Sequence, residues 1–232
     1  MFDFTNQVVL VTGASGNLGM AVAQAFQRAG ANLALIGRQA IPELTTNPTQ
    51  TLIQAADLTN EDETETAVRT IIDHFGRIDV LVHIVGGYRA GTPLHETPLA
   101  TLDFMLNLNA KTTFITNQAV IPYMIQQGTG KIINLASRPG LQGYANTSAY
   151  SAAKAAVIRL TESAAAELRD KGINVNCILP GTIDTPQNRD AMPNADFSRW
   201  VQPASLADVI LFLASPAARD IHGAAIPVYG RS

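Results

Sequence analysis

Short apolar segments alternate with longer helical patterns along the whole chain, and this alternation restricts the fold more than any other feature. Segments of four to eight apolar residues predict strands, and apolar residues at helical spacing predict helices. Strands that are apolar throughout are typical of a parallel sheet whose two faces are both covered by helices. The sequence therefore predicts an α/β fold with a doubly wound parallel sheet, the Rossmann architecture.

The predicted elements follow one another without a repeat, a low-complexity tract or a linker. A chain of 232 residues fits one large α/β domain, so we expect residues 1–232 to form a single domain. Strands are predicted at residues 8–11, 33–36, 51–55, 80–85, 131–135, 173–179 and 225–229. Helices are predicted at residues 18–29, 61–75, 99–126, 148–170 and 206–214, with Pro122 bending the end of the third.

Two connections stand out by their composition. Residues 39–50 contain two prolines and three threonines with little helical periodicity, so no full helix is expected between the second and third strands. Residues 182–199 are polar, contain Pro186 and Pro193, and follow the carboxyl end of a strand. Ligands bind at that end of the strands in an open parallel sheet, so this second segment is a candidate lid.

Composition and charge exclude several classes of function. A net charge of −3 gives no electrostatic basis for binding nucleic acid or an anionic membrane. No apolar segment approaches the ~20 residues needed to span a bilayer, and the N-terminus lacks the pattern of a secretory signal. The single Cys177 is expected to be a small buried hydrophobe. We therefore expect a cytoplasmic protein that acts on a small-molecule substrate, without a metal site.

The first predicted strand runs directly into a glycine-rich turn, which precedes the first helix. Glycines at this place allow a tight turn and a close approach of the backbone to a pyrophosphate. The helix then offers its free N–H groups and the positive end of its dipole to the phosphates. The residues predicted to bind the dinucleotide here are Gly13, Ser15, Gly16, Asn17, Leu18 and Gly19.

The end of the second strand bears on which dinucleotide binds. An NAD site commonly places an acidic residue there to bind the ribose hydroxyls, whereas this strand ends Ile36-Gly37-Arg38. Arg38 is able to form a bidentate pair with a 2′-phosphate, although it is also consistent with a solvated strand-end arginine. The sequence thus favours NADP over NAD.

Asp57 and Leu58 follow the third predicted strand. The Asp57 carboxylate has two possible roles that the sequence does not separate. It either accepts a hydrogen bond from the adenine amino group or caps the helix that begins near Asn60, for which Thr59 and Asn60 are further capping candidates.

Tyr150 and Lys154 lie four residues apart in a predicted helix, which places them on one face, one turn apart. A free tyrosine has a pKa of about 10 and is a poor acid or base near neutrality. A fixed ammonium beside the phenol stabilises the phenolate and lowers that pKa. The pair is therefore a candidate acid/base centre, in which the pKa of Tyr150 is expected to be lowered to about 7.

With the glycine turn and this pair in place, the chain resembles the short-chain dehydrogenase/reductase family, of the compact type, over essentially its full length. Residues 109–114 are similar to the asparagine-containing helix motif of the family, and residues 131–137 to the strand that ends in its catalytic serine. Ser137 stands thirteen residues before Tyr150, the separation usual in the family. Residues 174–181, followed by Thr185, resemble the Pro-Gly segment that borders the nicotinamide.

The resemblance implies a role for each matching residue. Tyr150 would be the general acid in carbonyl reduction or the base in alcohol oxidation, and Ser137 would polarise the substrate oxygen. Lys154 would lower the pKa of the tyrosine and hold the nicotinamide ribose, and Asn109 would position a water in the proton relay. It also implies a homotetramer or dimer that packs through residues 99–126 and 148–170. Further cofactor contacts would come from Gly86, Pro180, Gly181, Ile183 and Thr185.

The chain departs from the family pattern in three places. Asn17 replaces the second glycine of the compact T-G-x-x-x-G-x-G motif, so that Gly16 gives a spacing more like that of the extended members and the epimerases. His83-Ile84-Val85-Gly86 replaces Asn-Asn-Ala-Gly, and we expect His83 to be a hydrogen-bonded core residue rather than a catalyst. Tyr229-Gly230-Arg231 replaces the Asp-Gly-Gly ending.

The leading expectation is an NADP-dependent oxidoreductase that interconverts a carbonyl and a secondary alcohol. Gly86-Gly87-Tyr88 is similar to dihydropteridine reductases, a first alternative, although these generally lack the serine. A second alternative is a regulatory protein that binds NADP without chemistry, although such proteins typically lose the Tyr–Lys pair. The substrate is not readable, but several residues lie on segments expected to border its pocket: Tyr88, Arg89, His95, Arg138, Leu141, Gln142, Tyr144 and Trp200.

Overall fold

The structure, a computed structural model, describes residues 2–37 and 51–231, and these form one seven-stranded sheet in which every strand pair is parallel. The strand order is β3-β2-β1-β4-β5-β6-β7, so the direction of winding reverses between β1 and β4. This confirms the doubly wound fold, and the reversal creates the crevice in which such sheets bind ligands. The strands are β1 (Val8–Thr12), β2 (Asn32–Gly37), β3 (Thr51–Ala55), β4 (Val80–His83), β5 (Gly130–Leu135), β6 (Ile173–Pro180) and β7 (Ala225–Val228).

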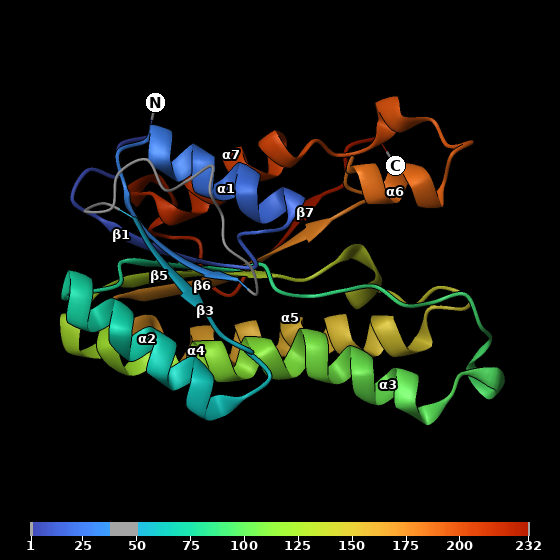
Figure 1. Cartoon of the computed structure of the whole chain (residues 1–232), viewed down its shortest axis with the longest axis horizontal. Coiled ribbons are helices and arrows are strands. Elements are labelled where there is room, and N and C mark those ends of the chain that lie inside the picture. The colour runs from blue at the N-terminus through green and yellow to red at the C-terminus, as the bar shows by residue number, and fades with distance from the viewer. Residues whose placement is uncertain (1, 38–50, 232) are drawn as a thin grey trace.

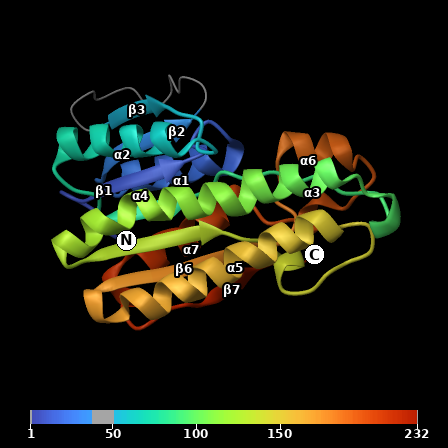
Figure 2. The same cartoon turned by 90° about the horizontal axis from the view of Figure 1, so that it is seen from below.

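Helices cover both faces of the sheet (Figure 1). The helices α1 (Asn17–Arg28) and α7 (Pro203–Ala214) lie on one face, and α2 (Glu61–Phe75), α4 (Thr112–Gln127) and α5 (Ser148–Leu168) on the other, as the view from below shows (Figure 2). Along β1, Val9 and Val11 join the apolar core beneath α1 and α7, whereas Leu10 joins the core beneath α2 and α4. This alternation follows from the pleat of the strand.

The limits of α2 illustrate how local sequence signals set an element. Asn60 caps its start by accepting a hydrogen bond from the Glu63 N–H at 3.3 Å, and Gly76 ends it with a left-handed φ of 77°. Both β3 and α2 have the limits predicted from sequence. The helix cap is Asn60, whereas the Asp57 carboxylate accepts hydrogen bonds from the backbone and hydroxyl of Thr59 at 2.9 and 2.8 Å.

The long helical region predicted at residues 99–126 is interrupted earlier than expected. It consists of α3 (Leu99–Met105), a π-helical segment at Leu106–Lys111, and α4, which continues past Pro122 to Gln127. A π-helical insertion is rare and frequently marks a functional site. Here it contains Asn109, one of the predicted site residues.

The predicted lid at residues 182–199 contains a short helix, α6 (Pro186–Ala191), that the sequence analysis did not predict. Asp184 holds this segment together by accepting hydrogen bonds from Arg189 at 2.6 and 2.7 Å and from Gln202 at 2.8 Å. These bonds lower the pKa of the Asp184 carboxyl to about 2. The expectation for residues 39–50 lies outside the described residues.

The described residues contain neither a helix that could span a membrane nor a cluster of metal-binding side chains. None of their helices is long and apolar enough to cross a membrane. Their His, Cys, Asp and Glu side chains form no group of three or more that could hold a metal ion. Cys177 is buried and free, as predicted.

Candidate functional site

In the turn between β1 and α1, the backbone of Gly13 lies close to the backbone of its neighbours Ile36 and Gly19. Gly13 adopts a left-handed φ of 68°, and its N–H donates to the Ile36 carbonyl oxygen at 2.8 Å. A Cβ on Gly19 would collide with the carbonyl oxygen of Gly13, so only glycine lets the helix start this close to the turn. The first helix therefore begins at the end of β1, with its N-terminus at the sheet's crevice.

The N-terminus of α1 has the properties of a phosphate site. No side chain in the described part of the chain caps it, and its first turn contains no acidic residue. The free N–H groups and the positive end of the dipole of a 12-residue helix are thus available to an anion. The first helical residue, Asn17, also reaches the lid, because its Nδ2 donates to Gln187 Oε1 at 2.6 Å.

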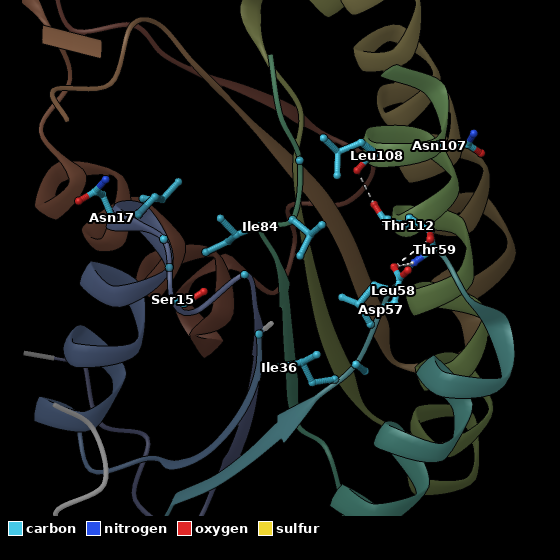
Figure 3. Close-up of a pocket in the computed structure, with 18 of the residues that line it drawn as sticks. Ser15, Asn17, Ile36, Asp57, Leu58, Thr59, Ile84, Asn107, Leu108 and Thr112 are labelled. Atoms are coloured by element: carbon cyan, nitrogen blue, oxygen red, sulfur yellow. Dashed lines mark hydrogen bonds between the residues drawn. The ribbon is translucent and has the colours of Figure 1, made fainter. Parts of the chain in front are cut away.

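A cavity of about 520 Å³ opens in front of this N-terminus (Figure 3). Its walls come from the glycine turn, the carboxyl ends of β2, β3 and β4, the helical region across the crevice, and the lid. The size, the uncapped helix and the glycine walls fit a dinucleotide. The lining residues are Gly13, Ser15, Gly16, Asn17, Leu18, Gly19, Ile36, Gly37, Ala56, Asp57, Leu58, Thr59, Ile84, Val85, Gly86, Phe104, Asn107, Leu108, Thr112 and Thr185.

The residues predicted for the adenosine end lie in this wall where they are described. Gly37, Asp57 and Leu58 line the cavity, with Leu58 itself buried. In Figure 3, Asp57 and Leu58 lie across the cavity from Ser15 and Asn17 of the glycine turn. Arg38, the predicted 2′-phosphate ligand, lies outside the described residues.

Of the residues predicted to border the nicotinamide, the structure places Gly86 and Thr185 in the cavity wall. Thr185 also caps α6 by accepting a hydrogen bond from the Asn188 N–H at 3.2 Å. The others anchor the base of the lid. Pro180 ends β6, Gly181 donates its N–H to the Val228 carbonyl oxygen at 3.0 Å, and Ile183 pairs with Val201.

The end of β5 and the start of α5 bring Ser137 and Tyr150 together. The Ser137 side chain lies close enough to the Tyr150 phenol to lower its pKa, although thirteen residues separate the two in the chain. Ser137 follows β5 with an extended backbone, and Tyr150 lies in the first turn of α5. Two hydroxyl groups therefore converge at the carboxyl edge of the sheet, although neither Ser137 nor Tyr150 is among the residues that line the cavity.

Lys154 lies one turn farther along α5 and is 3% exposed. Its Nζ donates to the Leu135 carbonyl oxygen at 2.8 Å, and a Cβ on Gly86 would come within 3.1 Å of it. Burial lowers the pKa of Lys154 to about 7. The amine is therefore close to its titration point at neutral pH, in a place that only a glycine at position 86 leaves open.

The pKa of Tyr150 differs from the sequence-based expectation. Burial raises it above the ordinary value, while the hydrogen bond with Ser137 opposes the rise and the nearby Tyr88 adds to it. The ammonium of Lys154 is directed at the Leu135 carbonyl, so burial decides the direction. The consequence is a phenol that stays protonated at neutral pH, which suits a proton donor.

Asn109 is fully buried and clamps the turn that follows β4. Its Oδ1 accepts from the Gly87 N–H at 3.1 Å, and its Nδ2 donates to the Gly87 carbonyl at 3.2 Å and to the Met105 carbonyl at 3.0 Å. The last bond satisfies a carbonyl within the irregular helical segment. Asn109 Oδ1 would also lie 2.7 Å from a Cβ on Gly86, so the amide fixes the wall next to Lys154.

His83 is the hydrogen-bonded core residue that was predicted. It is 1% exposed, with Nδ1 at 3.1 Å from the Thr12 hydroxyl and Nε2 at 3.3 Å from the Thr112 hydroxyl. Burial, with a smaller effect of Lys154, lowers its pKa to about 3. The imidazole is thus neutral under ordinary conditions and joins β1, β4 and α4.

The residues expected around the substrate pocket divide into two groups. Tyr88 contacts the ring of Tyr150, whereas the guanidinium of Arg138 lies 5.1 Å from the ring centre of Tyr229 and donates to the Tyr144 hydroxyl at 2.9 Å. Trp200, also expected near the pocket, is buried and packs against Phe197.

Comparison with known proteins assigns the family. A family model described as short chain dehydrogenase matches residues 7–196. The chain belongs to the short-chain dehydrogenase family. It is 36% identical over 243 residues to the 3-oxoacyl-[acyl-carrier-protein] reductase of Synechocystis sp., a match that covers 99% of this chain and 98% of that protein.

Other short-chain dehydrogenases are similar to this protein over nearly the whole chain. Levodione reductase of Leifsonia aquatica is 30% identical over 252 residues, covering 98% of this chain and 94% of that one. The solved structure of an NAD+-bound xylitol dehydrogenase superposes with a TM-score of 0.90 at 28% identity, covering 98% and 99% of the two chains. The chain is thus an NAD(P)-dependent oxidoreductase of carbonyl and alcohol groups.

Sequence reasoning missed part of the wall of this short-chain dehydrogenase. Phe104, Leu108 and Thr112 line the cavity from the helical region across the crevice (Figure 3 labels the last two). They are spaced four residues apart, so they share one helical face, and this spacing was the available signal. Ile84 and Val85 also line the cavity and lie just beyond the carboxyl end of β4. Ligands bind at these strand ends in an open parallel sheet, so this position was the available signal.

Proposed function

We propose that this chain is an NADP-dependent reductase that converts a carbonyl compound to a secondary alcohol, with Tyr150 as general acid and Ser137 as its partner. The observation that carries the proposal is the proximity of the Ser137 and Tyr150 side chains, one turn of α5 from Lys154, whose Nζ lies against Gly86 in the cavity wall. When bound, the dinucleotide supplies a hydride to the carbonyl carbon. The carbonyl oxygen gains a proton from the protein, so hydride and proton together yield the alcohol.

The protein side of this reaction follows from the positions of three groups. Ser137 donates a hydrogen bond to the carbonyl oxygen, and the Tyr150 phenol delivers the proton as negative charge develops there. The Tyr150 phenol is protonated at neutral pH, which is the state required of a proton donor in carbonyl reduction. Lys154 then stabilises the phenolate and returns a proton, because its own pKa lies near 7.

Asn109 is proposed as a positioning residue that maintains this arrangement. Its amide holds Gly87 from both sides and so fixes the turn next to Lys154. The water that the family resemblance assigns to Asn109 would join Lys154 to solvent, and it is part of the same proposal.

The preference for NADP over NAD is proposed from the end of β2. Gly37 lines the cavity where an NAD enzyme would place an acidic side chain, and Arg38 follows it in sequence. A relative is named a 3-oxoacyl-[acyl-carrier-protein] reductase, so a 3-oxoacyl thioester belongs in any first substrate screen.

Assembly and location are further proposals. We expect a cytoplasmic homotetramer or dimer that packs through α4 and α5, because α4 leaves Phe114 and Ile125 exposed. Light scattering at micromolar concentration tests the assembly, and a monomer there would contradict it.

The decisive experiment compares wild-type protein with Tyr150→Phe. Both are purified and assayed with NADPH and NADH on a panel of ketones, aldehydes and 3-oxoacyl thioesters. We expect the variant to lose about 10²- to 10⁴-fold in kcat while it still binds NADPH, because the ring remains and only the proton donor is removed. Equal turnover by the two proteins would show that Tyr150 is not the acid.

A further inference from the structure

Tyr88 is a large aromatic side chain that lies exposed beside the proposed catalytic tyrosine. Its ring contacts the ring of Tyr150 edge to face, with centroids 4.8 Å apart and planes inclined at 82°. Nevertheless the Tyr88 side chain is 68% exposed. Burying aromatic surface stabilises a complex. An exposed ring at the edge of a site is therefore available to pack against a bound ligand.

The backbone on both sides of Tyr88 is held in place. Before it, the peptide groups of Gly87 are clamped by the Asn109 amide at 3.1 and 3.2 Å. After it, the Gly91 N–H donates to the Asn146 carbonyl oxygen at 2.8 Å, which joins this loop to the start of α5. Tyr88 is therefore carried by a fixed segment, and a ligand need not order it on binding.

The residue next to Tyr88 is directed elsewhere. The guanidinium of Arg89 lies 4.3 Å from the ring centre of Phe104, on the far wall of the crevice. Tyr88 and Arg89 thus diverge, the one toward Tyr150 and the other toward α3. The surface that this loop presents beside the Tyr150 phenol is consequently aromatic.

The neighbouring loops add apolar surface at the same edge of the sheet. Leu141 follows β5 and is 54% exposed, and Met192 follows α6 in the lid and is 41% exposed. Strands β4, β5 and β6 are adjacent and parallel, so the loops after them emerge at one edge (Figure 1). Three adjacent loops therefore each expose a large apolar side chain there.

We propose that Tyr88 determines substrate specificity by packing against a planar, unsaturated group bonded to the carbonyl carbon, so that aryl and conjugated carbonyl compounds are preferred over saturated ones. The inference rests on the proposed function. When the carbonyl oxygen of a substrate accepts a hydrogen bond from Tyr150, the group attached to the carbonyl carbon lies next to Tyr88. A planar π-system gains an aromatic contact that a saturated ring of similar size does not. Such a contact corresponds to about a three- to tenfold preference.

The test uses two ketones of matched carbon number, 1-phenylethanone and 1-cyclohexylethanone, and three variants. Tyr88→Phe keeps the ring, Tyr88→Leu removes it, and Phe212→Leu makes the same change in an aromatic pair with Phe2, away from the site. We expect Tyr88→Leu to lower the phenyl-to-cyclohexyl ratio of kcat/KM by about three- to tenfold, mainly through KM. Tyr88→Phe and Phe212→Leu should leave that ratio within about twofold of wild type.

A second readout does not depend on turnover. Saturation-transfer NMR measures binding of each ketone to the protein loaded with oxidised NADP, which cannot reduce it. We expect wild type to bind the phenyl ketone more tightly, and Tyr88→Leu to abolish the difference. An unchanged ratio in Tyr88→Leu, or equal binding of both ketones by wild type, would overturn the inference.

The two proposals fail in distinguishable ways. If wild type reduces other carbonyl compounds but neither binds nor reduces the phenyl ketone, the substrate class is wrong and the proposed function remains. If wild type reduces no carbonyl compound, yet binds the phenyl ketone in a Tyr88-dependent manner, the proposed function is wrong and the aromatic subsite remains.

Discussion

Asn17 Nδ2 donates a hydrogen bond to Gln187 Oε1 at 2.6 Å and so joins the glycine turn to the lid across 170 residues of sequence. Asn17 stands where compact relatives have glycine, so a glycine there would lack this bond. The contact lies at the N-terminus of α1, where Asn17 also lines the cavity. The substitution that departs from the family motif therefore ties the lid to the phosphate end of the site.

We predict that this bond slows release of the cofactor. Asn17→Gly and Gln187→Ala should each raise the dissociation rate of NADPH by about two- to fivefold, because an exposed neutral hydrogen bond contributes little. Stopped-flow NADPH fluorescence measures the rate. The double variant should release NADPH no faster than either single variant, and additive effects would show that the two side chains act independently.

Lys154→Met is predicted to remove activity while changing the pH dependence of stability. The pKa of Lys154 is about 7 in the folded protein, whereas the ordinary value for lysine is 10.5, so between these values the unfolded chain binds the extra proton. Wild-type stability should therefore rise relative to the variant as pH increases from 7 to 10, by at most about 1.4 kcal/mol per pH unit.

Urea unfolding of both proteins at pH 6, 7, 8 and 9 checks the sign of this difference. Below pH 7 the folded wild-type protein carries the full cost of burying a charged lysine. In that range the free energy of unfolding of the variant should be highest relative to that of wild type. The Leu135 carbonyl loses its donor in the variant, which costs about 1–3 kcal/mol at every pH and leaves the slope unchanged. A stability difference that is constant with pH would mean that Lys154 is not perturbed.

Much of the fold could be predicted because local signals and the tertiary structure agree. Asn60 and Gly76 mark the ends of α2 in the sequence itself, and the apolar strands need only a parallel sheet to become buried. The π-helical segment could not be predicted in this way. It depends on the Asn109 amide meeting Gly87, which lies 22 residues away in the chain.

The candidate site shows the same division. Helical spacing predicted the pair Tyr150 and Lys154, the family resemblance added Ser137, and the structure places Ser137 close to Tyr150. The direction of the Tyr150 pKa was wrong, because spacing along a helix gives no measure of burial. Spacing along a helix also does not show that the Lys154 ammonium donates a hydrogen bond to the Leu135 carbonyl oxygen. The short helix α6 was missed because it is only six residues long and lies in a polar loop.

Cofactor preference is predicted to depend on Arg38 and Gly37. Arg38→Ala should weaken NADPH binding by about ten- to a hundredfold and leave NADH nearly unchanged, since a charge-assisted pair contributes about 1.5–3 kcal/mol. Gly37→Asp should shift preference toward NADH by repelling the 2′-phosphate and binding the ribose. Arg28→Ala, at the far end of α1, is the matched control.

Fluorescence titration of each variant with both cofactors measures these affinities. Wild type should bind NADPH more tightly than NADH, and the control should bind as wild type does. A wild-type preference for NADH would contradict the assignment of Arg38 to the 2′-phosphate.

His83→Asn is predicted to make the protein more resistant to acid. The pKa of His83 is about 3 in the folded protein, whereas the ordinary value for histidine is 6.5, so between these values only the unfolded chain is protonated. Wild-type stability should therefore fall by at most about 1.4 kcal/mol for each pH unit below 6.5, and the variant should lack this dependence. Urea unfolding at pH 7.5, 6.0 and 5.0 measures it.

The comparison among variants isolates the buried imidazole from other acid effects. At pH 7.5 the variant should be equal to or less stable than wild type, because Asn must replace bonds to the Thr12 and Thr112 hydroxyls. His95→Asn, which alters an exposed histidine, should follow wild type at every pH. If His83→Asn and wild type lost stability in parallel as pH falls, the acid sensitivity would arise elsewhere, and His83 would not be the group that takes up a proton on unfolding.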